Sequence, residues 1–287
     1  AWSHGGLRFR GVFQDLLTSQ KANSAAAEFI KSKIRQKITN PTTADILTNI
    51  DHPYAAKRPP IDTHYFETFN KEHVTLVDLQ ADPIATITHN GIALESGSHH
   101  ELDVIVFATG YDAMTGPLLN LNIETPKASL KSYWAEGPRN YLGLAIPGFP
   151  NLFTITGPGS PSVLSNMPVS IEQHVDWITD CIDHCIKIGC TSIEAQEQSA
   201  EIWTDHVRET AHATLLPKVQ HSWYLGANIP GKPRVFMPYA GGLNIYRKIC
   251  DNVAEEGYKG FELNSEKVRD TSMSLDFNSS EGFGLGV

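Results

Sequence analysis

Two adjacent cations, Lys57 and Arg58, are the side chains of this sequence best arranged to act on a negatively charged group. Pro59 and Pro60 follow them directly. Each proline fixes its own φ and restrains the residue before it, so the pair forms a stiff, preorganised positive point. The same residues also fit a solvated basic pair beside a turn, and the local sequence leaves both interpretations open.

A second candidate site lies where an apolar run ends at Ala108-Thr109-Gly110. The run, residues 104–107, is rich in β-branched side chains, which predicts a short strand buried on both faces. Small residues after a buried strand let another backbone or a ligand come close, because no bulky side chain blocks the approach. The alternative is a core strand that simply ends in a turn.

Two other patterns predict no site. The Gly-Pro-Gly-Ser-Pro-Ser sequence at 157–162 follows an expected strand, but its prolines lack the N–H groups that a loop needs to hold a pyrophosphate. Its last residue is also neither glycine nor alanine. Cys181 and Cys185, with His184 beside them, lack a second ligand pair at a spacing typical of zinc. We therefore expect neither a dinucleotide loop nor a metal centre at these places.

The overall composition narrows the class of protein. The 287 residues are 41% hydrophobic and 19% charged, and the formal net charge of -9 argues against a nucleic-acid surface. Four cysteines, three of them within residues 181–190 on or just after one expected helix, favour a reducing cytoplasm over a disulfide framework. No apolar run approaches the roughly 20 residues that cross a bilayer, so we expect no membrane span. The start at Ala1-Trp2, without an initiator methionine or a leader, predicts part of a longer protein.

The elements that would position these residues follow from hydrophobic periodicity and from start and stop signals. Asn40 before Pro41 predicts a helix start, and Gly189 predicts a helix end. The Asn90-Gly91 pair predicts a hairpin. The expected helices cover 11–38, a short stretch from Pro41, 169–188, 194–214 and 243–256. The expected strands cover 74–78, 84–88, 92–95, 104–107, 150–156 and 235–237.

Five motifs, in this order along the chain, resemble the Baeyer–Villiger monooxygenases, flavoenzymes that insert one oxygen atom beside a carbonyl. They are Lys57-Arg58-Pro59, residues 107–112 (Phe-Ala-Thr-Gly-Tyr-Asp), residues 157–167, residues 223–232 and Gly241-Gly242 before Tyr246-Arg247. The ordered set reaches from about Gly5 to Leu263 and is most similar to the phenylacetone and cyclohexanone monooxygenase branch. It implies an α/β fold, the C-terminal part of a flavoprotein with two dinucleotide-binding domains and a helical subdomain.

The resemblance also implies a role for individual residues. The family uses FAD, NADPH and dioxygen, and its reaction passes through oxygen anions. Arg58 would stabilise these anions, because a guanidinium keeps its charge at any working pH. Lys57 would bind the 2′-phosphate of NADPH, and Trp223 would help to hold that cofactor. Further cofactor contacts are implied for Thr109, Gly110, Asp112 and Asn166, and a ketone pocket for Ser162, Val163, Leu164 and Met167.

By the same resemblance the chain would divide into four parts. These are a helical subdomain at 1–52, the C-terminal part of the NADPH-binding domain at 53–110, the C-terminal part of the FAD-binding domain at 111–263, and a loose tail at 264–287. The Gly-rich loops of both dinucleotide-binding domains would lie in an N-terminal half that this sequence lacks. We therefore expect the chain alone to bind FAD poorly, and its uncovered sheet edges favour a partner that supplies that half.

The implied substrate is a small-molecule ketone, converted to an ester or lactone, and two other functions stay open. A truncated homologue that stands alone could bind a ketone or lactone, or act as an isomerase or cyclase without redox chemistry. A flavin monooxygenase acting on nitrogen or sulfur is the third possibility. It fits less well, because Arg58 is the feature most closely tied to ketone chemistry in the resemblance.

Overall fold

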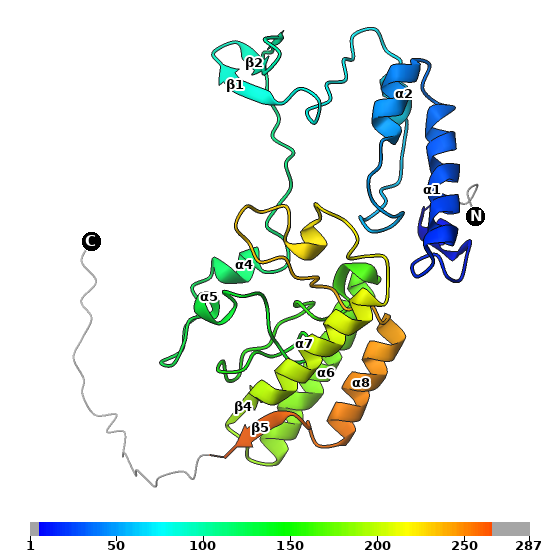
Figure 1. Cartoon of the computed structure of the whole chain (residues 1–287). Helices are drawn as coiled ribbons and strands as arrows, with labels where there is room; N and C mark the ends of the chain where they lie inside the picture. The colour runs from blue at the N-terminus through cyan, green and yellow to red at the C-terminus, as the bar shows by residue number, and fades with distance from the viewer. Residues whose placement is uncertain (1–5, 266–287) are drawn as a thin grey trace, which may run out of the picture.

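The structure is a computed structural model that describes residues 6–265. The predicted tail therefore falls almost wholly outside the described residues. Figure 1 shows a helical subdomain, a small β-meander and a larger body joined by extended chain. The helices are η2 (Gly6–Gly11), α1 (Gln20–Arg35), α2 (Pro41–Thr48), α3 (Tyr65–Thr68), α4 (Gly116–Leu119), α5 (Leu130–Tyr133), η3 (Ser162–Leu164), α6 (Met167–Lys187), α7 (Glu197–His212), η4 (Trp223–Leu225) and α8 (Leu243–Glu255). The strands are β1 (Ile84–Thr88), β2 (Gly91–Leu94), β3 (His99–Glu101), β4 (Ser192–Ala195) and β5 (Phe261–Asn264).

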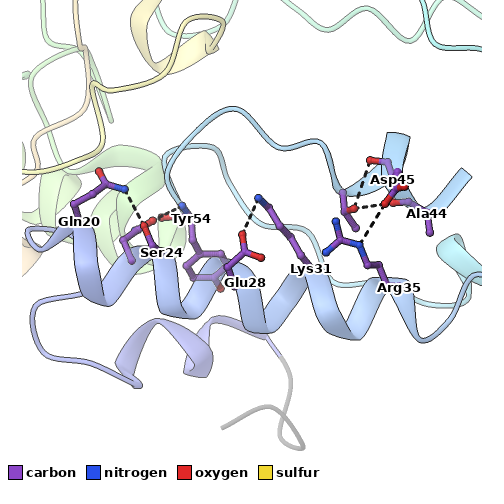
Figure 2. Close-up of polar contacts among 10 residues, drawn as sticks. Gln20, Ser24, Glu28, Lys31, Arg35, Ala44, Asp45 and Tyr54 are labelled. Atoms are coloured by element: carbon purple, nitrogen blue, oxygen red, sulfur yellow. Dashed lines mark hydrogen bonds and ion pairs between the residues drawn. The ribbon is translucent and has the colours of Figure 1, made fainter. Parts of the chain in front are cut away.

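The helical subdomain forms where capping signals predict it. The side chain of Asn40 accepts a hydrogen bond from the Thr43 N–H, and Pro41 occupies the first helical position of α2, as expected. Within α1, Lys31 pairs with Glu28 at 3.1 Å, and Arg35 reaches across to Asp45 of α2 at 3.7 Å (Figure 2). The expected helix over 11–38 is shorter than predicted, because α1 begins only at Gln20, after the Ser19 cap.

The segment that carries Lys57 and Arg58 is fastened to the end of α1. Lys37 forms ion pairs with Asp62 and, at 3.2 Å, with Glu67. Asn70 accepts a hydrogen bond from the Thr39 N–H at 2.8 Å and donates one to the Lys37 carbonyl at 2.7 Å. Residues 62–70 are therefore held at two points, which fixes the path of the chain just after the two cations.

The hairpin is confirmed. β1 pairs with β2 in antiparallel register, with Thr88 opposite Gly91, and β3 extends the sheet to three strands. A short turn at His89-Asn90 joins the first two. The pairing partners lie within a few residues of each other, so local sequence is enough to specify them.

The prediction of a buried strand at 104–107 is wrong. Val104, Val106 and Phe107 are 75%, 81% and 71% exposed, and no described residue makes a backbone hydrogen bond to this run. Figure 1 shows it as an extended trace between the meander and α4. A strand needs a neighbouring backbone to pair with, and the described chain places none beside this segment.

Three further expected strands are also absent. Residues 74–78 form no strand, and 150–156 contain a single isolated bridge, between Ala145 and Phe153. Residues 235–237 are hydrogen-bonded without forming a regular strand, because the Val235 and Met237 N–H groups donate to the carbonyls of Leu225 and Tyr224. Conversely, the start of the helix expected at 194–214 is taken by β4, which pairs with β5.

The core lies where α6, α7 and α8 pack together, with β4 and β5 at one end (Figure 1). Trp177, Trp203 and Tyr246 fill it, and each polar ring atom has an acceptor. The indole of Trp177 donates to the Cys250 carbonyl at 2.8 Å and the Tyr246 hydroxyl to the Leu142 carbonyl at 2.7 Å. Buried aromatic rings whose polar handles are satisfied give a stable, uniquely packed core. Gly189, with φ of 69°, directly follows the C-cap residue of α6, so the helix ends where predicted.

Candidate active site

Arg58 lies against the predicted substrate pocket. Ala56, two residues earlier, is fully buried in an apolar cluster that also contacts Val163, Leu164 and Trp223. Arg58 itself is exposed and donates from Nη1 to the Val163 carbonyl at 2.8 Å. Lys57 is exposed, with no ion-pair partner within residues 6–265. The buried alanine thus anchors the segment, and the two cations stand at its edge.

The predicted pocket residues occupy a tight turn before α6. Ser162 is 2% exposed, has φ of 41° and directs its Oγ to the Met114 sulfur at 3.7 Å. Val163 and Leu164 are partly buried beside the same apolar cluster. Met167 is the first residue of α6. Asn166 holds the N-cap position, but its side chain makes no capping bond there, which leaves an exposed amide at a helix start.

Asp112 joins two of the motifs. Its carboxylate forms an ion pair with Lys232, whose side chain is only 12% exposed. The Tyr111 carbonyl accepts from Asn228 Nδ2 at 2.9 Å, so residues 111–112 are held to the 223–232 loop at two points. Thr109 and Gly110, the residues just before, are exposed. The structure gives these two residues no contact with Arg58.

Trp223 begins η4 and is half-buried. Its ring lies edge-on to Tyr224, with centroids 4.6 Å apart. Within the described residues its indole N–H has no hydrogen-bond acceptor, so the donor stays available for a ligand. Burial raises the pKa of Tyr224, and the positive charge of Arg58 acts in the opposite direction, which places the guanidinium within electrostatic reach of this tyrosine.

The backbone of the loop at 157–162 makes hydrogen bonds within the protein. The Gly159 N–H donates to the Met237 carbonyl at 2.7 Å, and the Ser160 N–H to the Gly157 carbonyl at 3.1 Å. Asn140 donates to the Pro158 carbonyl as well. A β-carbon on Gly157 would lie 2.6 Å from the Gly143 carbonyl oxygen, so this glycine serves close packing of backbone. These amides do not form an anion cradle, in agreement with the sequence.

A buried histidine fixes the start of that loop. His174 of α6 is completely buried, and its Nδ1 accepts from the Thr156 N–H at 2.9 Å. Thr156 has φ of 54°, an unusual conformation for threonine that this bond helps to hold. Burial lowers the pKa of His174 to about 4, so the ring is neutral near pH 7 and carries its proton on Nε2.

The structure brings predicted site residues together at two places. Arg58 bonds to Val163, and Asp112 pairs with the loop that begins at Trp223. Ser162 instead contacts Met114, which was not predicted as a site residue. Lys232, Asn228 and His174 were not singled out from the sequence. No spacing signal could have found the first two, since they lie more than a hundred residues from their partners.

Several other features of the described chain bear on function. Two hollows of about 470 and 280 Å³ lie against α1 and α2 and between α6 and α8, away from these residues. Cys181, Cys185, Cys190 and Cys250 are free thiols. Residues 6–265 contain no cluster of ligating side chains suited to a metal. None of their helices is long and apolar enough to cross a bilayer.

Comparison with known proteins places these motifs in a class, the flavin-dependent monooxygenases. A Baeyer–Villiger monooxygenase from Pseudooceanicola batsensis is 44% identical over 273 residues, which are 93% of this chain and 49% of that protein. The structure of a cyclohexanone monooxygenase from Rhodococcus sp. Phi1, bound to NADP+, matches with a TM-score of 0.88 at 40% identity, over 92% of this chain and 50% of that one. A phenazine N-monooxygenase from Lysobacter antibioticus is 40% identical over 92% of the chain and 49% of its own length.

The resemblance and the fold class predicted from the sequence are thereby confirmed. The chain is a relative of the Baeyer–Villiger monooxygenases, and it spans about half the length of the curated relatives it matches. No protein-family model matches it.

Proposed function

We propose that this chain is the C-terminal portion of an FAD- and NADPH-dependent Baeyer–Villiger monooxygenase that converts a ketone to an ester or lactone. The observation that carries the proposal is the bond from Arg58 to the Val163 carbonyl, which sets a permanent positive charge beside the residues expected to line the ketone pocket. The sequence similarity to ketone monooxygenases supports the same conclusion.

The residues present fit the two cofactors only in part. Lys57 is a cation suited to a phosphate, and Trp223 offers a partly exposed ring; neither Lys57 nor the Trp223 N–H has a partner among the described residues. The N–H groups of Gly159 and Ser160 are used internally, and Pro158 and Pro161 have none, so this loop is poorly suited to hold a pyrophosphate group. NADPH and FAD, when bound, would supply the electrons that activate dioxygen, the source of the inserted oxygen atom. This chain would then contribute binding groups and the charge of Arg58.

In this proposal the role of Arg58 is electrostatic. A guanidinium has five N–H donors, and the structure uses one nitrogen to hold the group against the Val163 carbonyl. The remaining donors can face an oxygen anion that forms on the ketone carbon. Because the prolines and the buried Ala56 fix the segment in advance, little reorganisation would be needed when that charge develops.

The test is reconstitution. The chain is mixed with a second polypeptide, the part of the P. batsensis enzyme that this chain does not span, together with FAD. We expect flavin absorbance to copurify with the pair and NADPH oxidation to depend on added ketone, with an ester as product. If neither flavin retention nor ketone-dependent oxidation appears, the proposal is wrong, and turnover by the chain without any cofactor would instead support a stand-alone role.

Oxygenation of an aromatic nitrogen is the second candidate, since a relative at 40% identity is named a phenazine N-monooxygenase. The same reconstituted pair separates the two reactions when a cyclic ketone and phenazine are offered as alternative substrates. Formation of the lactone supports the first candidate, and formation of the N-oxide supports the second. A reducing compartment suits either reaction, because all four cysteines are free thiols.

A further inference from the structure

The hollow of about 280 Å³ between α6 and α8 is lined mainly by acidic side chains. The two helices pack against each other (Figure 1). The charged groups of the lining are Asp176 and Asp180 from α6 and Arg247, Asp251 and Glu255 from α8. None of them forms an ion pair within residues 6–265. Four carboxylates against one guanidinium leave an excess of negative charge that the described chain does not balance, which favours a cation.

A buried glutamine in the lining lacks hydrogen-bond partners. Gln173 of α6 is 7% exposed, yet neither its side-chain nitrogen nor its oxygen makes a hydrogen bond within the described residues. Burial raises the pKa of the Cys250 thiol, and Tyr246 and Gln173 act in the opposite direction, which indicates that the amide N–H side faces the sulfur. The amide oxygen is left for a ligand. Since an unpaired buried acceptor is costly, a bound N–H donor here is stabilising.

Apolar atoms complete the lining. Trp177 is 5% exposed, and its indole N–H donates to the Cys250 carbonyl at 2.8 Å, so it offers only ring carbon to a ligand. Ala254 of α8 adds a methyl group. Such a surface suits a methylene chain rather than a fully hydrated ion. The volume is near the lower end of the range for ligand pockets, which fits a slender molecule.

The carboxylates stand at two levels along the hollow. Asp176 and Asp180 are separated by one turn of α6, about 6 Å along the helix axis, and Asp251 and Glu255 repeat this spacing in α8. Arg247, one turn before Asp251, opposes a further positive charge at that end. A compact metal ion fits poorly, because the described part of the chain contains no cluster of ligating side chains suited to one.

We propose that this hollow binds a small aliphatic diamine, with its methylene chain over Trp177 and one ammonium group bonded to Gln173 Oε1. The two ammonium groups neutralise carboxylates at the two levels, because a spacer of four carbons spans about one helical turn. A lysine side chain from a partner protein brings only one ammonium group, so a free diamine is the better occupant. The proposal goes beyond ketone oxidation and does not depend on it, since no residue of the hollow belongs to the candidate active site.

Calorimetric titration of the full chain with putrescine, a four-carbon diamine, tests the proposal. We expect one site with a dissociation constant below about 1 mM, from a few exposed ion pairs and one hydrogen bond to a charged group. Butylamine, which has a single ammonium group, should bind at least about fivefold more weakly. Mg²⁺ at the same concentration should not displace the diamine, because the described residues offer it no ligand cluster.

Three variants locate the site. Gln173→Met removes the amide acceptor, so binding should weaken at least about tenfold, while the melting temperature of the free chain should not fall. Asp251→Asn, at an exposed position, should weaken binding about three- to fivefold, and it decides the matter if the first variant does not fold. Glu172→Gln is the matched control, because it removes the same charge from an exposed position of α6 outside the hollow and should leave binding unchanged.

The proposal is overturned if butylamine binds as tightly as putrescine, if folded Gln173→Met binds like the wild type, or if Glu172→Gln weakens binding as much as Asp251→Asn. Absence of binding at about 10 mM putrescine also overturns it. Displacement by Mg²⁺ would identify a diffuse acidic surface instead, and a lysine-containing peptide that binds as tightly would identify a partner protein as the occupant. None of these results bears on ketone oxidation, which the reconstitution experiment decides separately.

Discussion

At the scale of single residues, Arg58 carries the chemistry that we propose. In the assembled enzyme, Arg58→Ala should lower ester formation by about 100- to 1000-fold, the usual effect of removing a group that stabilises a developing oxyanion. Flavin absorbance should stay, because the side chain contacts the pocket at Val163 rather than a cofactor loop. Product analysis by gas chromatography and a flavin spectrum of the same sample measure the two effects.

The conservative change Arg58→Lys serves as the companion to that variant. Lysine keeps the positive charge but lacks the planar guanidinium with its several N–H donors. We therefore expect an activity between those of the wild type and the alanine variant. Lys57→Ala is the matched control, since it removes a neighbouring cation that makes no ion pair among the described residues. It should raise KM for NADPH while the ester formed per NADPH consumed stays constant. An undiminished ester yield from Arg58→Ala would rule out its role.

His174 makes the stability of the chain depend on pH. The unfolded imidazole binds a proton below about pH 6.5, whereas the buried folded one does so only below about 4. Its folded pKa is depressed, so the unfolded state takes up more protons in this window. The free energy of unfolding should therefore fall as the pH drops from 6.5 to 4, by at most about 3 kcal/mol from this group.

Urea denaturation at several pH values between 4 and 7.5 measures this dependence. His174→Asn is the reference, because an asparagine oxygen can still accept from the Thr156 N–H but does not titrate. The variant should lose most of the decline between pH 6.5 and 4. Equal pH dependence in the two proteins would show that other groups are responsible.

At the scale of elements, the sequence specified what is local. The hairpin at 84–95 and the start of α2 at Pro41 were predicted because their turn and cap residues lie beside the segments they join. The ion pair between Asp112 and Lys232 was not predicted, because the spacing of two residues so far apart gives no signal that they are in contact. Residues 104–107 show the converse: their composition predicts a strand, but a strand also requires a partner, and residues 6–265 place none beside them.

Lys37 links two elements, the end of α1 and the segment after the two cations. Because it bonds to both Asp62 and Glu67, Lys37→Ala should loosen residues 62–70. Both partners are partly solvated, so we expect a loss of only about 1 kcal/mol in the local stability. The bond from Lys37 is the main cause of the lowered pKa of Asp62, so the contribution is present near pH 7 and is lost as the pH falls through that pKa. Hydrogen exchange of the 62–70 amides measures it.

Lys31→Ala provides the control on the same helix. Lys31 pairs only with Glu28, one turn away in α1, so its loss should leave exchange in 62–70 unchanged. Lys37→Arg should restore most of the protection, since a guanidinium can bond to both carboxylates. If Lys37→Ala and Lys31→Ala give the same exchange pattern, the ion pairs do not hold this segment.

At the scale of the whole molecule, the described chain combines a well-packed core with a surface that exposes apolar side chains. The helices α6, α7 and α8 bury Trp177, Trp203 and Tyr246, whose polar ring groups all donate hydrogen bonds, whereas the stretch from β1 to Tyr111 exposes apolar side chains. The core should therefore fold in this chain on its own. The cysteines report on this division, because three of them are buried within the core and one lies at its margin.

Native thiol titration of the chain alone tests whether the core is independent. Burial raises the pKa of Cys250 to about 12 and also raises those of Cys181 and Cys185, and a protonated buried thiol reacts slowly. Cys190 is only half-buried, so one thiol should react rapidly with an aromatic disulfide reagent and three only at the rate at which the core unfolds. Cys190→Ser should abolish the rapid phase, and urea should merge the remaining phases. If all four thiols react at once in buffer, α6 to α8 do not pack stably in this chain alone.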